Sequence, residues 1–111
     1  VSHVNYAGLE SHPQHARARE LFEGFGGVLS FEVAGGVEAA ERVINRVKLP
    51  IVAPSLGGVE TLITRPVTTS HSGMSAEDRA RLGISDGLIR LSVGIEATDD
   101  LIADFDQALK D

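Results

Sequence analysis

Arg90 is the residue of this chain most suited to a chemical role, because it interrupts a run of apolar residues. Residues 88–95 are rich in branched side chains closed by a glycine, which predicts a strand. Side chains alternate between the two faces of a strand, so Arg90 shares one face with Leu88 and Ser92. The opposite face holds Ile89, Leu91 and Val93. A guanidinium placed here needs a partner, because desolvating an unpaired charge is costly.

Two kinds of partner fit Arg90. An ion pair with Glu32 or Glu96 would make the arginine a structural residue. A bound carboxylate would make it a functional one, since the parallel N–H donors of a guanidinium match both carboxylate oxygens. The residue types alone leave both partners open.

The segment 54–58, Pro-Ser-Leu-Gly-Gly, is the second candidate for chemistry. Ser55 follows Pro54, which ends a short predicted strand, and two glycines come shortly after it. Glycines let a backbone approach a ligand closely, and exposed N–H groups beside a hydroxyl can cradle a carboxylate. A plain turn between two strands explains the same residues equally well.

Two other groupings favour structure over chemistry. His12 and His15 have a spacing that suits a metal, but they lie across Pro13 at a helix start and lack a third ligand, so we expect no metal site. Residues 24–27 are glycine-rich but precede a strand, whereas phosphate loops lead from a strand into a helix. They therefore predict a turn.

A hydrolytic site is also disfavoured. Ser55, His71 and Ser92 could be drawn as a nucleophile and base, but no nucleophile elbow surrounds either serine. The chain has no cysteine, which excludes a thiol nucleophile, a thiolate metal site and a disulfide framework.

Length and composition indicate one small globular domain. The 111 residues are 42% hydrophobic and 23% charged, as in ordinary soluble proteins. A net charge of −6 argues against a nucleic-acid partner. No apolar stretch approaches the roughly 20 residues of a membrane helix, so we expect no membrane partner and a cytoplasmic location. The chain starts at Val1 and its only methionine is Met74, which predicts a processed, truncated or partly observed product.

Short strands alternate with amphipathic helices along the chain. Strands are predicted at residues 4–6, 28–33, 51–52, 59–64 and 88–95, and helices at 14–22, 35–47, 76–82 and from 98 onward. Ser75 and Thr98 are the expected N-caps of the last two helices. The expected buried stripes are Val37, Ala40, Val43, Ile44 and Val47 in the second helix and Leu101, Ile102, Phe105, Ala108 and Leu109 in the last.

This pattern predicts an α/β fold, with a small, mostly antiparallel sheet covered by helices on one face. The second face of the two clearest strands is partly polar, because it carries Ser30 and Glu32 on one strand and Arg90 and Ser92 on the other. Such a face meets either water or another domain.

Eight segments carry a family resemblance in the family's order over nearly the whole chain: residues 6–9, 11–15, 24–31, 55–60, 69–71, 79 with 83–86, 88–96 and 100–102. In these segments the chain resembles the C-terminal domain of the Cys/Met-metabolism family of pyridoxal-phosphate enzymes, which are of fold type I. The family includes cystathionine γ-synthase, cystathionine γ-lyase, methionine γ-lyase and O-acetylhomoserine sulfhydrylase. The resemblance identifies the family but does not distinguish between its members.

The resemblance implies roles for three residues. Arg90 would bind the α-carboxylate of a γ-substituted amino-acid substrate. Ser55 would line the same site as a catalytic residue that holds the catalytic lysine, and the backbone at Leu56 would help with the carboxylate. Pyridoxal phosphate would act as the electron sink for loss of the γ-substituent, by replacement or elimination. A homo-oligomer, a dimer of dimers, is implied at full length.

The cofactor half of such a site is missing. The only lysines are Lys48 and Lys110, and neither has the Ser-x-Thr-Lys context of the family's Schiff-base lysine. The phosphate loop and the ring-stacking tyrosine are also absent. Residues 1–111 are therefore expected to form a single C-terminal substrate-carboxylate-binding domain, inactive without a large domain of the same protein that binds the cofactor.

Two questions stay open. Pro54, Ala7 and Ala97 depart from common family residues and leave the preferred reaction undecided. The alternative function is a stand-alone amino-acid-binding or regulatory α/β module, built on the same one-sided sheet.

Overall fold

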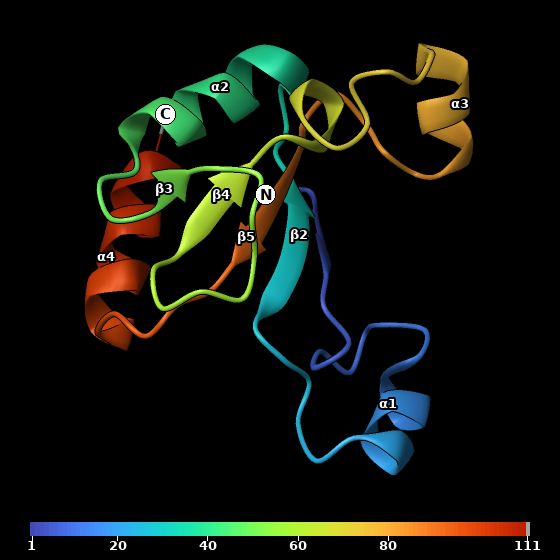
Figure 1. Ribbon diagram of the computed structural model, residues 1–111, viewed down its shortest axis with the longest axis vertical. Coiled ribbons are helices and arrows are strands. Elements are labelled where there is room, and N and C mark those ends of the chain that lie inside the picture. The colour runs from blue at the N-terminus through green and yellow to red at the C-terminus, as the bar shows by residue number, and fades with distance from the viewer. Residues whose placement is uncertain (111) are drawn as a thin grey trace.

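The structure, a computed structural model, describes residues 1–110 and contains one five-stranded sheet (Figure 1). The strands lie in the order β1-β2-β5-β4-β3, and every neighbouring pair is antiparallel except β3 with β4. Their bounds are β1 His3–Asn5, β2 Val28–Glu32, β3 Ile51–Val52, β4 Leu62–Thr64 and β5 Leu88–Ser92. The mostly antiparallel sheet predicted from the alternating patterns is confirmed.

Two of the four α-helices cover one face of the sheet. The helices are α1 His15–Leu21, α2 Gly36–Arg46, α3 Ala76–Arg81 and α4 Thr98–Ala108, with a short 3₁₀ helix η1 Pro66–Thr68. Figure 1 shows α2 and α4 together beside the sheet, whereas α1 and α3 lie apart from both, toward opposite ends of the molecule. The predicted one-sided helical layer is therefore formed by α2 and α4.

The core lies between the sheet and these two helices. Ile63 of β4 and Ile89 of β5 are both 0% exposed at its centre. The other buried apolar members are Phe31, Val33, Ala39, Ala40, Val43, Leu91 and Ala108. Strand alternation explains the members from the sheet, and the apolar stripes of α2 and α4 explain the members from the helices.

The second face of the sheet is partly polar, as predicted. In the register of the three central strands, Ser30 and Thr64 lie on either side of Arg90, and Ser92 lies beside Leu62. Directly paired residues point to the same face. Arg90 therefore projects from the middle of the sheet, opposite the helical layer.

Two strands are three residues shorter than predicted: β5 ends at Ser92 and not at residue 95, and β4 begins at Leu62 and not at residue 59. Residues 59–61 do not extend β4, because the Val59 carbonyl and the Thr61 N–H are directed to the segment after β5. The Ile95 N–H donates to the Val59 carbonyl at 2.8 Å, and the Thr61 N–H donates to the Glu96 carboxylate at 2.8 Å. The ladder of β4 starts only at Leu62.

One predicted N-cap is confirmed, whereas the other N-cap and three residues of the predicted buried stripes differ from prediction. The Ser75 hydroxyl accepts the Asp78 N–H at 3.2 Å, which confirms that N-cap. Ala97, and not Thr98, occupies the N-cap position of α4, without a side-chain cap. Ile102 is 62% exposed, Val37 38% and Leu109 37%, so none of them belongs to the buried stripe assigned to it. Within residues 1–110, no helix has the length and apolar character required to cross a membrane.

Candidate functional site

The Arg90 guanidinium lies beneath the turn that carries Ser55. Its Nη2 donates to the carbonyl oxygens of Pro54 at 2.7 Å and of Ser55 at 2.8 Å. We call residues 54–60 the Arg90 loop. The structure therefore brings together Arg90 and Ser55, two residues that are 35 positions apart in the chain.

Neither expected ion pair of Arg90 forms. Glu32 accepts a hydrogen bond from the Ser85 hydroxyl at 2.9 Å, and Glu96 binds Thr61. The salt bridges within residues 1–110 do not include Arg90. The loop carbonyls solvate the guanidinium but do not neutralise its positive charge.

Two nitrogens of the Arg90 guanidinium, Nε and Nη1, have no hydrogen-bond acceptor within residues 1–110. Nη2 carries two hydrogens, and the two loop carbonyls accept both of them. Nε is buried without a partner. Nη1 makes no hydrogen bond to any residue that the structure describes. Nη1 is therefore the donor that the loop leaves free, whereas both hydrogens of Nη2 are held by the loop carbonyls.

The Arg90 loop presents its side chains to solvent. Ser55 is exposed, and Leu56 is 57% exposed. Gly57 adopts φ +76°, a conformation that favours glycine, and its N–H donates to the Ser92 hydroxyl at 2.9 Å. This N–H is thus directed at the sheet and is not part of an outward cradle. The Leu56 N–H has no acceptor within residues 1–110.

The far end of the loop is held by a contact that sequence reasoning missed. Thr61, which is 0% exposed, donates its N–H to Oε2 of Glu96 at 2.8 Å and its hydroxyl to Oε1 at 2.7 Å. The Thr61 N–H and hydroxyl lower the pKa of the Glu96 carboxyl below its usual value. No local pattern could have revealed a pair whose members lie 35 residues apart.

The histidines serve local structure. The His15 ring lies 2.7 Å from the Ala7 carbonyl through Nδ1 and stacks on Phe25 with ring centroids 5.3 Å apart. Nδ1 of His12 accepts the Gln14 N–H at 3.1 Å. In the described part of the chain, no group of three or more metal-ligating side chains is placed to hold an ion.

The nucleophile–base arrangement is not assembled. Nδ1 of His71 lies 2.7 Å from the Ser70 hydroxyl, its immediate neighbour. The Ser92 hydroxyl is 2% exposed and contacts the Arg90 loop instead. Neither Ser55 nor Ser92 is hydrogen-bonded to His71 within residues 1–110.

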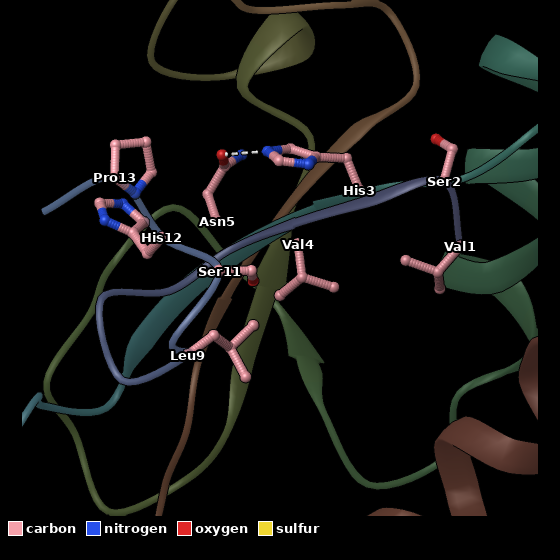
Figure 2. A pocket seen from close by; sticks show the side chains of 9 residues that line it. All are labelled: Val1, Ser2, His3, Val4, Asn5, Leu9, Ser11, His12 and Pro13. Carbon is pink, nitrogen blue, oxygen red and sulfur yellow. Dashed lines mark hydrogen bonds between the residues drawn. The ribbon is translucent and has the colours of Figure 1, made fainter. Parts of the chain in front are cut away.

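A hollow of about 380 Å³ beside β1 shares no lining residue with the Arg90 loop (Figure 2). The ring of His3 and the amide of Asn5 point toward each other there, with Nε2 and Oδ1 2.8 Å apart. Val4 and Leu9 supply apolar surface on the other side. Because its nearest polar groups already pair with each other, this hollow offers no evident chemistry.

Arg65 is a buried arginine that the sequence did not single out. It is 8% exposed, and its Nη1 lies 3.2 Å from Oε1 of Glu41 in α2. Its Nη2 donates to the Asp86 carbonyl at 3.0 Å. These contacts join α2, the end of β4 and the turn before β5, so Arg65 is a structural residue.

Comparison with known proteins places this geometry in a family. The model of the family described as Cys/Met metabolism PLP-dependent enzyme matches residues 1–110. The O-succinylhomoserine sulfhydrylase of Pseudomonas aeruginosa is 50% identical over 98% of this chain and 27% of its own length. The cystathionine γ-lyase of Dictyostelium discoideum is also 50% identical, over 98% of this chain and 28% of its own.

A solved structure agrees. Cystathionine γ-synthase from Xanthomonas oryzae pv. oryzae, in complex with cystathionine, superposes with a TM-score of 0.93 at 46% identity. The match covers 98% of this chain and 28% of that one. The chain spans little more than a quarter of the length of the curated relatives it matches. It belongs to the family of Cys/Met metabolism PLP-dependent enzymes.

Proposed function

We propose that this chain is the substrate-carboxylate-binding domain of a pyridoxal-phosphate-dependent enzyme that acts on γ-substituted amino acids, by γ-replacement or γ-elimination. One observation carries the proposal: Arg90 projects from the polar face of the sheet beneath an exposed loop, and no acidic side chain of residues 1–110 is paired to it. Family membership supports the amino-acid substrate, because the similar proteins are named as enzymes of sulfur amino acids.

Charge supports an anionic ligand for Arg90. The carbonyl oxygens of Pro54 and Ser55 hold Nη2 in place while leaving the cation unneutralised. A carboxylate that binds at Nη1 adds a charge-assisted hydrogen bond, which is about twice as strong as a neutral one. Arg90 does no bond breaking in this scheme; it orients the substrate so that the reacting bonds are presented in one geometry.

The exposed parts of the loop suit the remaining contacts. The Ser55 hydroxyl has no hydrogen-bond partner within residues 1–110, so it is free to hold an amine such as that of a lysine outside this chain. The Leu56 N–H also has no acceptor within residues 1–110, but it faces away from Nη2, because a trans peptide directs its N–H opposite to its carbonyl and the Ser55 carbonyl is at Arg90.

This chain's own residues do not fit the cofactor. Pyridoxal phosphate supplies an electron sink when bound to a lysine. Lys48 and Lys110 follow α2 and α4, the helices on the apolar face, and Nζ of Lys110 pairs with Asp106 at 3.4 Å. Arg90 projects from the other face. The cofactor is therefore held by a large domain outside this chain, and residues 1–111 alone are inactive.

Exposed apolar side chains support a larger assembly. Leu21 and Phe22 at the end of α1 are 58% and 63% exposed, and Ile95 after β5 is 81% exposed. Apolar surface of this kind is commonly covered by another domain or subunit. We assign these surfaces to the large domain and to a homo-oligomer, a dimer of dimers, in the cytoplasm. The stand-alone module has no comparable support, since the matched relatives are enzymes of which the chain is about a quarter.

The test is a pair of substitutions in the full-length enzyme. Arg90→Ala is expected to raise KM for the amino-acid substrate about 10- to 100-fold, because a charge-assisted hydrogen bond is lost. The KM of Arg90→Lys should lie between those of the parent and Arg90→Ala. Cofactor absorbance should stay unchanged in both. Arg81→Ala is the matched control, because Arg81 is 71% exposed on α3. An unchanged KM in Arg90→Ala would refute the carboxylate role, and Arg90-dependent amino-acid binding by the 111-residue chain alone would favour the module.

A further inference from the structure

We infer that Ser92, Thr61 and Glu96 are positioning residues, which hold the Arg90 loop in the shape that receives a carboxylate. We call these three residues the loop anchors. None of them is expected to touch the substrate; they act through the loop backbone. The inference rests on the proposed function and extends it from Arg90 and Ser55 to the residues that place them.

The Arg90 loop has no packing of its own. Every residue from 54 to 60 is exposed, and its largest apolar side chains, Leu56 and Val59, are 57% and 64% exposed. A segment without buried side chains gains no conformational order from the hydrophobic core. Its shape must therefore come from polar contacts to its backbone.

Ser92 supplies the contact beneath the middle of the loop. Its buried hydroxyl accepts the Gly57 N–H at 2.9 Å. Ser92 lies two residues beyond Arg90 on the same strand and face, so the two side chains hold neighbouring parts of one loop. Without this acceptor, the Gly57 peptide would be free to turn its N–H toward solvent, and the adjoining Leu56 peptide would turn with it.

Thr61 and Glu96 supply the contact at the far end. The Glu96 carboxylate accepts both the N–H and the hydroxyl of Thr61, and the same hydroxyl accepts the Gly94 N–H at 2.9 Å. The loop end is thereby joined to the segment that continues β5. A hydrogen bond to an ionised group is stronger than a neutral one, so the Glu96 contact, like those of Arg90, is stronger than the contact from Ser92.

All of these contacts originate from one continuous piece of chain. Residues 90–96 carry Arg90, Ser92, Gly94 and Glu96, and they contact the loop at both ends and in the middle. The position of the guanidinium and the shape of the loop are thus set by one element. Removal of an anchor is expected to weaken substrate binding and to leave the chemical step intact.

The experiment compares KM and kcat of the full-length enzyme. Ser92→Ala removes the acceptor of Gly57, and Thr61→Val removes the buried hydroxyl with little change of shape. Each is expected to raise KM about three- to tenfold, the worth of one hydrogen bond, with kcat and cofactor absorbance within about twofold of the parent. Thr61→Ser, which keeps the hydroxyl, should restore the parental KM. Ser72→Ala, at an exposed serine outside the anchors, is the control.

Arg90→Ala, measured in parallel, separates the two proposals. If Arg90→Ala raises KM while Ser92→Ala and Thr61→Val do not, the anchors are not positioning residues and the proposed function stands. If Arg90→Ala also leaves KM unchanged, the proposed function fails and the inference fails with it. Lower kcat and cofactor content at constant KM would indicate a merely structural role and overturn the inference.

Discussion

Asp104 of α4 accepts the backbone N–H of Leu49 at 2.8 Å and so joins the last helix to the turn between α2 and β3. The same carboxylate accepts the Lys48 N–H at 2.8 Å and the Gln107 side-chain amide at 2.9 Å. Burial of Asp104, which is 7% exposed, acts to raise its pKa. The hydrogen bonds from Leu49, Gln107 and Lys48 outweigh burial, and the pKa is lowered.

Asp104→Asn is expected to destabilise the protein by about 1–3 kcal/mol at pH 7, because backbone donors lose a charged acceptor. The pKa of Asp104 is lower in the folded than in the unfolded state, so its contribution to stability is fully present above the ordinary pKa of 3.8. It is lost as the pH falls through the lower folded-state pKa. The difference in unfolding free energy between the parent and Asp104→Asn should therefore become smaller below about pH 4, as measured by urea unfolding at a series of pH values.

Asp106→Asn is the control for this measurement. Asp106 lies on the same helix but is 70% exposed, and its partner is Lys110 one turn away. Its removal should change the free energy of unfolding by less than about 0.5 kcal/mol. The assignment of Asp104 as an ionised acceptor would be contradicted if the difference in unfolding free energy between the parent and Asp104→Asn stayed constant from neutral to acid pH.

Gly94→Ala should displace the Arg90 loop. A Cβ at Gly94 would overlap the Val59 carbonyl oxygen and the Glu60 carbonyl carbon, which are backbone atoms without room to rotate away. We expect a loss of about 1–3 kcal/mol in the free energy of unfolding, together with a higher KM in the full-length enzyme. Gly73→Ala is the matched control, because a Cβ there meets nothing within 4 Å. Equal behaviour of the two variants would show that the loop does not need its close approach to Gly94.

Ile89→Ala and Ile102→Ala should differ sharply. Ile89 is 0% exposed at the centre of the core, and its truncation should cost about 2–5 kcal/mol in unfolding free energy. Ile102 is 62% exposed, so the same substitution should cost less than about 1 kcal/mol. Denaturant unfolding of both variants provides the comparison. A similar cost at the two positions would mean that α4 presents a different face to the sheet.

The sequence predicted features that depend on near neighbours. Strand alternation placed Arg90 and Ser92 on the face opposite Ile89, and the structure confirms this. The Ser75 cap was predictable for the same reason, since its acceptor and donor lie three residues apart. The proximity of Ser55 to Arg90 was suggested only by the family resemblance, because it joins two distant segments.

The features that escaped prediction depend on distant segments. Thr61 and Glu96 pair across 35 residues, and Arg65 reaches Glu41 across 24. Ile102 was assigned to the buried face of α4 by periodicity, but Asp104 is buried instead, because it accepts the N–H groups after α2. Successive helix residues point about 100° apart, so residues 102 and 104 point in nearly opposite directions. A helix whose Asp104 points inward therefore has Ile102 pointing outward. Hydrophobic patterns carry no signal for a buried polar anchor of this kind.

The central claim is that Arg90 recognises the substrate α-carboxylate, and a binding cycle tests it most directly. An unreactive γ-substituted amino acid and the corresponding amine without the carboxylate are titrated into full-length parent enzyme and Arg90→Ala, with cofactor absorbance as the readout. The parent should prefer the amino acid over the amine by about tenfold or more, the worth of a charge-assisted contact, and Arg90→Ala should lose that preference. A preference for the carboxylate that survives in Arg90→Ala would contradict the account.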